Sequence, residues 1–257
     1  MPDAGDKAVK LYVIPGSNPS LTTRLMLERK GIPYDRVDLL PVISKGVLRA
    51  AGFPGVTVPA MKLPDGRRVQ GSLEISKALE ELSPEPPLYP SDPAERAKVE
   101  EAERWAEQVP QERARRVIWW ALKRDRSPMT SFSEGSKLPV PAGLAVRTAG
   151  PIVAISGRIN GSTDEGVRIA LTGLPEVLDH ADALIAAGVL GGDEPNAADY
   201  QLAPSLRLLM SMDDLRPAIE PRPCGQLALR VCPDFPGKIP PVFPAEWLEP
   251  LRSATQA

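Results

Sequence analysis

The strongest constraint on the fold is a βαβ pattern that runs from Lys10 to Leu40. A short apolar run, Leu11 to Ile14, is typical of a strand, and the dipeptide Pro15-Gly16 interrupts it. Apolar residues then recur at helical spacing as far as Gly31, a natural helix C-terminus, and a second strand is predicted over Tyr34 to Val37. Two strands joined by one helix predict parallel pairing with a right-handed crossover.

The turn after the first strand brings a hydroxyl, that of Ser17, to the start of a helix. Open α/β sheets bind ligands at the carboxyl ends of their strands, and a helix N-terminus favours negative charge, so Ser17 is placed to meet an anionic group. Serine is also common at helix starts because its side chain accepts a hydrogen bond from the first turn, and Asn18 can play the same capping role. The sequence leaves both interpretations of Ser17 open.

Length and charge narrow the class of protein. A chain of 257 residues suggests two domains. Lys and Arg number 31 against 33 Asp and Glu, which gives a net charge of -2 and no basic surplus for binding phosphates, so we expect no nucleic-acid partner. The N-terminal MPDAGDKAVK has no apolar core of a signal peptide, and the longest apolar stretch, around Gly150 to Gly157, is too short to span a bilayer. We therefore predict a cytoplasmic protein without a membrane partner.

Residues that bind metals or act as nucleophiles are few. Cys224 and Cys232 are the only cysteines; they could form a disulfide, but two free, partly buried thiols are expected in an intracellular chain. No metal site is predicted from so few ligands. His180 is the only histidine and lies in a helical run beside Asp179 and Asp182, where we expect a helix-surface residue rather than a catalytic one.

The segment after the second strand completes the first half of the chain. A helix is predicted from Pro41 to about Gly52, followed by a hairpin, VTVPAMKLPDGRRVQG, that turns at Pro64-Asp65-Gly66. Because proline removes a ladder donor, Pro59 predicts the start or edge of a strand and a cis Val58-Pro59 bond in a tight bend. Ser72 is then expected to cap the helix GSLEISKALEEL.

The second half is predicted to be helical. Helices are expected over Pro93 to Asp125 with a kink near Pro110, over Leu144 to Ile159, and over Asp164 to Ala187 with a bend at Pro175. The polar, proline-broken segment Arg126 to Val140 is predicted to be a loop, either a lid or an irregular crossing.

Three further features belong to this helical half. Asn196 and Asp199 form a capping box that begins a helix, and we assign them to folding. The proline-rich tail from Arg216 is expected to wrap the helices, with a short helix near Gln226 to Val231 and Trp247 as an anchor. The tryptophans of the long helix, Trp105, Trp119 and Trp120, have the spacing of core residues, although they could also line an apolar site above Ser17.

Residues Lys10 to Leu82 resemble the thioredoxin-like N-terminal domain of the glutathione transferase superfamily. The GSNPS turn is similar to the serine turn of the tau- and zeta-like classes, and RLMLERKGIPYDRVDL is similar to their first helix and second strand. The Val58-Pro59 pair resembles their cis-proline loop, and DGRRVQGSLEISKALEEL resembles the segment that ends the domain. The resemblance implies an α/β thioredoxin-like domain over residues 8–83, a linker over 84–92, and an all-α domain with a proline-rich tail over 93–257.

The resemblance also implies roles for single residues. Ser17 would donate a hydrogen bond to the glutathione sulfur and favour its thiolate, which makes Ser17 the expected catalytic residue. The expected thiol-binding residues are Asn18, Val58, Pro59, Gly71 and Ser72; the backbone of Val58 would pair with the cysteinyl unit, and Ser72 would hold the γ-glutamyl carboxylate. Gly71 departs from the family, which has an acidic or amide residue there. Lys45 and Arg49 are the candidates for the glycyl carboxylate.

The sequence therefore predicts a glutathione S-transferase-like enzyme that activates a small thiol for attack on a hydrophobic electrophile, as in detoxification. Glutathione or another low-molecular-weight thiol would be the co-substrate, with no permanently bound cofactor. We expect a symmetric homodimer, unless the proline-rich tail covers that surface. Because Gly71 removes a contact to the thiol, a non-catalytic ligand-binding or partner-docking protein on the same fold is the alternative. A disulfide oxidoreductase would need a cysteine at the Ser17 turn, where none is present.

Overall fold

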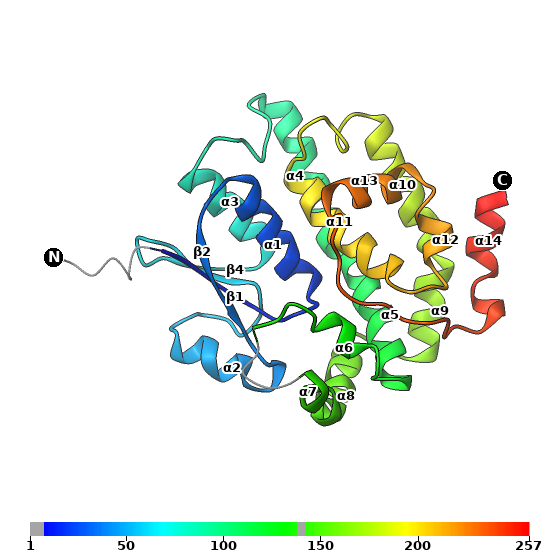
Figure 1. Ribbon diagram of the computed structural model, residues 1–257. Helices are drawn as coiled ribbons and strands as arrows, with labels where there is room; N and C mark the ends of the chain where they lie inside the picture. Colours follow the sequence, from blue (N-terminus) through cyan, green and yellow to red (C-terminus); the bar gives the residue numbers. More distant parts are fainter. Residues whose placement is uncertain (1–7, 138–141, 257) are drawn as a thin grey trace.

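A four-stranded mixed sheet forms the N-terminal part of the computed structural model, which describes residues 8–137 and 142–256 (Figure 1). The strands β1 (Val9–Val13), β2 (Tyr34–Asp38), β3 (Ala60–Lys62) and β4 (Arg68–Gln70) lie in the order β2-β1-β3-β4. β1 and β2 are parallel, whereas β3 is antiparallel to both β1 and β4. The predicted βαβ unit and hairpin are therefore confirmed.

Helices cover both faces of this sheet. α1 (Asn18–Arg29) and α3 (Ser72–Leu82) lie on one face, and α2 (Pro41–Ala50) lies on the other (Figure 1). Alternate residues of β1 divide between the two sides, as the period of two requires. Leu11 belongs to the large core on the α1 side, whereas Tyr12 packs edge-to-face on Phe53 on the α2 side.

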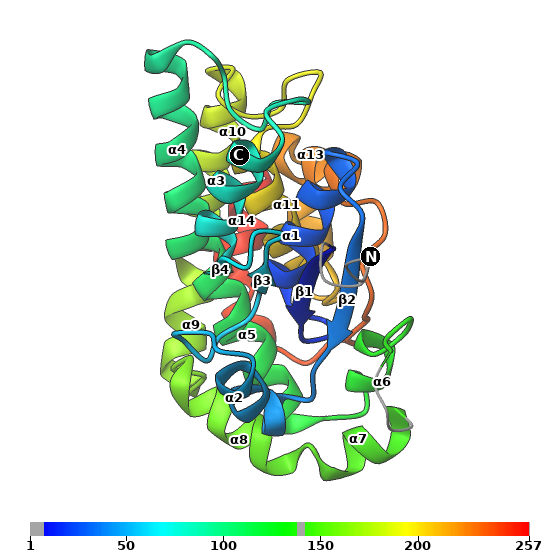
Figure 2. The ribbon, with the colours of Figure 1, turned by 90° about the vertical axis from the view of Figure 1, so that its left-hand side faces the viewer.

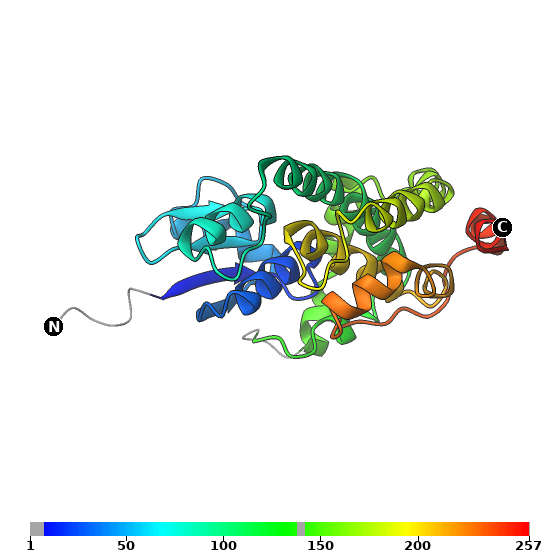
Figure 3. The same ribbon diagram turned by 90° about the horizontal axis from the view of Figure 1, so that it is seen from above.

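The C-terminal part is built from helices packed around α11 (Ala197–Met210), all of whose residues are buried. Figure 3 shows this part beside the sheet, with the last helix at the far end. The other helices are α4 (Pro93–Gln108), α5 (Pro110–Arg124), α6 (Met129–Phe132), α7 (Ala142–Thr148), α8 (Gly150–Ile159), α9 (Asp164–Thr172), α10 (Leu174–Ala186), α12 (Arg216–Ile219), α13 (Pro223–Val231) and α14 (Glu249–Gln256). The predicted fold class, a thioredoxin-like domain followed by helices, is confirmed.

Most of the described helices have a proline in their first turn. Proline is tolerated there because the N–H group that it lacks would have no partner within the helix. The kink predicted near Pro110 is confirmed: α5 begins there, below the end of α4 in Figure 2. The single helix predicted over Leu144 to Ile159 is wrong, since the chain breaks at Ala149 and α8 restarts with Pro151 in its first turn. The bend predicted at Pro175 lies instead at Gly173, where α9 ends and α10 begins.

The capping box predicted at the start of α11 is present. The side-chain oxygen of Asn196 accepts from the amides of Ala198 and Asp199 at 2.9 and 3.2 Å, and the Asp199 carboxylate accepts from the Asn196 amide at 2.9 Å. These bonds satisfy amides that would otherwise be buried without a partner at the centre of the helical part.

The C-terminal tail lies along the helical part, as predicted. The ring of Trp247 lies 5.2 Å from that of Trp120, which also stacks on Phe243. α13 accounts for the expected short helix, whereas α14 was not predicted. Cys224 and Cys232 are free, as expected, but are fully buried rather than partly so. Within the described part of the chain, no helix combines the length and the apolarity that crossing a bilayer requires.

Candidate functional site

Ser17 occupies the N-cap position of α1, with the extended backbone angles φ -77° and ψ 117°. Its amide donates to the Ile14 carbonyl oxygen at 3.1 Å, and its carbonyl oxygen accepts from Leu21 at 3.0 Å. The Ser17 side chain, however, accepts no hydrogen bond from the first turn. The capping interpretation of the Ser17 hydroxyl is therefore wrong. Asn18 is the first residue of α1 rather than its N-cap, and its side-chain nitrogen donates to Ser205 in α11 at 3.0 Å.

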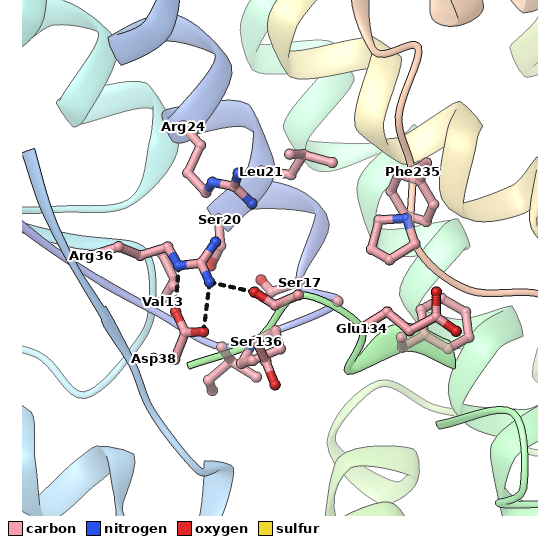
Figure 4. A pocket seen from close by; sticks show the side chains of 16 residues that line it. Val13, Ser17, Ser20, Leu21, Arg24, Arg36, Asp38, Glu134, Ser136 and Phe235 are labelled. Atoms are coloured by element: carbon pink, nitrogen blue, oxygen red, sulfur yellow. Dashed lines mark hydrogen bonds and ion pairs between the residues drawn. The ribbon is translucent and has the colours of Figure 1, made fainter. Parts of the chain in front are cut away.

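The Ser17 side chain lines a cavity of about 60 Å³ at the carboxyl end of β1 (Figure 4). The wall is made of the β1–α1 turn, the first turns of α1, the end of β2, the segment 132–136 and the tail residues Phe235 and Pro236. Pockets for small molecules typically measure about 300–1,000 Å³, so this cavity holds only a small group. It lies at the strand end where the sequence predicted a ligand.

Two further polar side chains of α1, those of Ser20 and Arg24, line the same cavity. Ser20 is 3% exposed, and its hydroxyl oxygen has no hydrogen-bond partner in the described structure. Arg24 makes two long contacts, from Nε to the Tyr34 hydroxyl at 3.4 Å and from Nη2 to Glu28 Oε1 at 3.7 Å. The sequence prediction included neither Ser20 nor Arg24, although their spacing from Ser17 places them on the same side of the helix.

A buried ion pair at the end of β2 binds the backbone of the segment 135–137, which covers the cavity. Arg36 and Asp38 are two residues apart on the strand and pair at 2.8 Å (Nε to Oδ1) and 3.0 Å (Nη2 to Oδ2). Arg36 Nη2 also donates to the Gly135 carbonyl oxygen at 2.7 Å, and Asp38 Oδ2 accepts from the Lys137 amide at 2.6 Å. Sequence reasoning missed this pair, because its partners lie 99 residues further along the chain.

The segment predicted as a loop, Arg126 to Val140, contributes the rest of the cover. It contains the short helix α6, which corrects the loop prediction; residues 138–140 lie outside the described part of the chain. Ser131 Oγ accepts from the Lys238 amide at 3.1 Å, which joins α6 to the tail. The ring of Phe132 packs against the backbone of Gly237, whose φ is +102°.

The other predicted thiol-binding residues form a second group, beside β3. The Val58-Pro59 bond is cis, as predicted, and the Gly71 amide donates to the Pro59 carbonyl oxygen at 3.0 Å. Gly71 is the N-cap of α3, so the prediction that Ser72 caps this helix is wrong. The Ser72 hydroxyl is buried without a hydrogen-bond partner among the described residues. This group does not line the Ser17 cavity within the part of the chain that the structure describes.

Gln70 fixes the loop that leads to Val58. Its side-chain oxygen accepts from the Gly55 amide at 2.6 Å, and its side-chain nitrogen donates to the Thr57 carbonyl oxygen at 3.0 Å. The space in front of Gly71 is open: apart from Gly71 and its two chain neighbours, no atom of the described structure lies within 4 Å of the position that a Cβ would take. Lys45 and Arg49 are exposed on α2 and do not line the cavity.

The tryptophans of the long helix and His180 do not line the cavity. Trp120 is buried in the core, and Trp105 packs edge-to-face on His180 with 4.5 Å between ring centroids. His180 is exposed on α10, as expected for a helix-surface residue. In the described ranges no cluster of three His, Cys, Asp or Glu side chains could hold a metal ion.

A buried carboxyl group joins the two parts of the protein away from the cavity. Glu103 of α4 is 2% exposed and accepts hydrogen bonds from Ser76 Oγ at 2.6 Å and the Tyr89 hydroxyl at 2.8 Å. Burial raises the pKa of Glu103 to about 7, although both hydrogen bonds oppose this rise. The same burial, together with the Glu103 charge, raises the pKa of Tyr89.

Comparisons with known proteins agree with this architecture. Residues 11–87 match the family model for the glutathione S-transferase N-terminal domain. Glutathione transferase F2 from Populus trichocarpa superposes with a TM-score of 0.60 at 18% identity, over 97% of this chain and 100% of that chain. A glutathione S-transferase of Ceriporiopsis subvermispora in complex with glutathione gives a TM-score of 0.57 at 18% identity, over 93% and 99% of the two chains.

A glutathione S-transferase from Rhodospirillum rubrum F11 gives a TM-score of 0.53 at 21% identity, over 94% of this chain and 99% of that one. The comparison with curated proteins found no match. The match over residues 11–87 and the superpositions over nearly the whole chain confirm the resemblance inferred from the sequence. The chain therefore has the glutathione S-transferase fold: residues 11–87 match the model of that family's N-terminal domain, and a helical C-terminal part follows.

Proposed function

We propose that this protein is a glutathione S-transferase-like enzyme that activates a small thiol at Ser17 for attack on an electrophilic carbon. The observation that carries the proposal is the Ser17 hydroxyl, which makes no cap bond to α1 and lines a cavity at the N-terminus of that helix. A hydroxyl donor and the positive end of a helix both favour a thiolate over a thiol. Since the thiolate is the nucleophile, lowering the thiol pKa raises the reactive fraction at neutral pH.

In the proposed reaction the thiol loses its proton to solvent, and the Ser17 hydroxyl donates a hydrogen bond to the sulfur. The sulfur electron pair then forms a bond to the electrophilic carbon. In a substitution the leaving group departs with its bonding pair, and in an addition a proton from water completes the product. The electrophile is a hydrophobic small molecule in this proposal, and detoxification is the corresponding role.

The second group of residues supports a thiol that carries an amino-acid-like portion. The unpartnered Ser72 hydroxyl at the start of α3 fits a carboxylate, because a helix N-terminus also favours negative charge there. The backbone beside cis-Pro59 and the open space in front of Gly71 leave room for a peptide-like unit. Glutathione has these features and is bound in the similar structure of the glutathione S-transferase from Ceriporiopsis subvermispora. Glutathione or another low-molecular-weight thiol is therefore the proposed co-substrate.

The size of the cavity favours a second candidate, a non-catalytic binding protein on the same fold. At about 60 Å³ the cavity accepts the sulfur end of a thiol but not a whole glutathione, and Gly71 lacks the side-chain contact expected in the family. The enzyme proposal therefore requires the segment 132–136 or residues 235–236 of the tail to move when a thiol binds. The binding-protein alternative requires no such movement.

Isothermal titration calorimetry with glutathione, cysteine and coenzyme A tests the proposal directly. We expect saturable binding of at least one thiol, weakened in Ser17→Ala and in Ser72→Ala. Ser44→Ala is a matched control, because Ser44 is a buried α2 serine whose hydroxyl donates to the Pro41 carbonyl oxygen. Absence of heat with every thiol would favour the non-catalytic alternative.

The proposal includes an assembly and a location. We propose the domain limits 8–83 and 93–257 with a linker between them, a cytoplasmic location and a symmetric homodimer. The start of the linker is tied to α1 by Lys30, whose ammonium group donates to the carbonyl oxygens of Ser83 at 2.5 Å and Pro86 at 2.9 Å. Light scattering that gave the mass of one chain, 27.7 kDa, at micromolar concentration would contradict the dimer.

A further inference from the structure

We infer that Ser20 is a second hydroxyl donor to the anionic atom that binds at Ser17, so that the site holds its anion between two serine hydroxyls. The inference deepens the proposed function and rests on it for the identity of the anion, a thiolate sulfur. The feature that suggests it is the hydroxyl of Ser20, which is buried and lacks a hydrogen-bond partner in the described structure. Buried polar groups are nearly always paired, so an unpaired hydroxyl beside a cavity suggests a missing ligand.

The position of Ser20 in α1 explains why its hydroxyl is free. Thr22 and Thr23, two and three residues later, donate their hydroxyls to the carbonyl oxygens of Asn18 and Pro19, four residues before each of them. The corresponding partner of Ser20 would be Gly16, which precedes the helix and has a φ of +74°. The local bond that satisfies its neighbours is therefore missing for Ser20.

The first turn of α1 needs donors from side chains. A helix N-terminus offers its first amides to an anion, but Pro19 in this turn has no N–H group. Ser17 and Ser20, three residues apart, lie on the same side of the helix and line the same cavity (Figure 4). The hydroxyls of Ser17 and Ser20 can thus donate hydrogen bonds to an anion in place of the amide that Pro19 lacks.

The charges around the cavity favour a single negative charge near Ser20. Arg36 is neutralised by Asp38, whereas Arg24, one helical turn from Ser20, makes two long contacts, to Tyr34 and Glu28. The one other acidic side chain among the described lining residues is Glu134, whose carboxylate points away from Ser17 in Figure 4. Arg24 and the N-terminus of α1 therefore place positive charge beside Ser20, where a monovalent anion would be favoured.

A buried hydroxyl without a partner is not by itself a binding site, and Ser162 provides the comparison. It is also 3% exposed, and its hydroxyl is also unpartnered in the described structure, but it lies in the turn between α8 and α9 and lines no part of the Ser17 cavity. Ser162→Ala therefore removes the same group from an equally buried position. It is the matched control for Ser20→Ala.

The experiment measures thermal stability without ligand and the pKa of bound glutathione, the latter from thiolate absorbance near 240 nm as a function of pH. Removing an unpartnered hydroxyl leaves no group unsatisfied, so Ser20→Ala and Ser162→Ala should melt at or above the wild-type temperature. With glutathione bound, Ser20→Ala should raise the thiol pKa by about one unit and weaken binding about tenfold at neutral pH. Ser162→Ala should change neither the thiol pKa nor the affinity. Ser20→Thr keeps a hydroxyl, so its thiol pKa and affinity should lie between those of Ser20→Ala and wild type.

The outcomes separate this inference from the proposed function. If wild type binds glutathione and Ser20→Ala binds it with the same affinity and thiol pKa, the inference is wrong while the proposed function stands. If wild type binds no thiol, the proposed function fails, and thiocyanate, a monovalent sulfur-containing anion, becomes the probe in calorimetry. Thiocyanate binding that weakens in Ser20→Ala but not in Ser162→Ala supports the second donor; absence of binding, or equal binding in all three proteins, overturns it.

Discussion

The side-chain amide of Asn18 donates a hydrogen bond to the Ser205 hydroxyl across 187 residues of sequence, and both residues are buried where α1 meets α11. The residue next to Ser17 therefore joins the sheet part to the helical part. Asn18 was predicted to contact the thiol, but its amide group is already engaged. We therefore propose that Asn18 positions the start of α1 through its side-chain nitrogen, while its contact with the thiol stays a prediction.

We predict that Asn18→Ala destabilises the protein by about 1–3 kcal/mol, because it leaves the Ser205 hydroxyl buried without its donor. Ser205→Ala should cost a similar amount, and the double variant should cost less than the sum, since both changes remove the same bond. Urea unfolding of the three variants measures this coupling. Strictly additive losses would show that the bond contributes nothing.

The Arg36–Asp38 pair should control how tightly the segment 135–137 covers the cavity. Arg36→Gln leaves the Asp38 carboxylate, 2% exposed, without its cation, which typically costs about 3–5 kcal/mol for a buried pair. Hydrogen exchange at Lys137 should accelerate, because its amide donates to Asp38. Arg67→Gln is the control: Arg67 and Asp65 are each 53% exposed, and solvent screens an exposed pair so that it contributes little to stability. Equal effects of the two substitutions would contradict this role.

Gly237→Ala should loosen the tail from α6. A methyl group at this position would lie 2.2 Å from a ring carbon of Phe132, and the φ of +102° disfavours any residue with a Cβ. Gly66→Ala separates the two causes, because Gly66 has a φ of +89° but open space around its missing Cβ. We expect about 1 kcal/mol of backbone strain in both variants and a larger loss, with faster proteolysis near residue 237, only in Gly237→Ala.

Glu103 should make stability depend on pH. Its pKa is raised to about 7 in the folded protein, from 4.5, so the folded state binds the proton more tightly than the unfolded state does. The stabilisation is complete below about pH 4.5 and is lost as the pH rises through 7. Among the surrounding charges, Lys77 lowers the pKa of Glu103 and Glu100 raises it. Glu103→Gln cannot ionise and should remove this pH dependence, gaining of order 2 kcal/mol relative to wild type between pH 5 and 8. Parallel stability curves for the two proteins would contradict the prediction.

Much of the fold could be predicted from local patterns. The βαβ unit, the hairpin, the cis Val58-Pro59 bond and the Asn196 capping box each depend on residues close together in sequence, and all four are present. Helix ends were less predictable, as at Ala149, because a proline marks a break only to within a few residues.

The candidate site could be predicted only in part, because its cover is built from distant segments. Ser17 was found from its place after a strand, but the hydroxyl was as consistent with a cap as with a site. The covering residues Phe132 and Phe235 lie more than 100 residues along the chain, and no local pattern connects them to Ser17. In the sequence Arg36 has the pattern of an ordinary polar strand residue, and only the folded structure brings it to the carbonyl oxygen of Gly135.

The most direct test of the central claim is the pKa of glutathione bound to Ser17→Ala, compared with that of wild type. If the Ser17 hydroxyl stabilises the thiolate, losing a hydrogen bond to a charged group should raise the thiol pKa by about one to two units and lower turnover at neutral pH. The melting temperature should hold, because the hydroxyl makes no cap bond to α1. An unchanged thiol pKa and equal turnover at pH 7, with readily measured activity, would contradict the account.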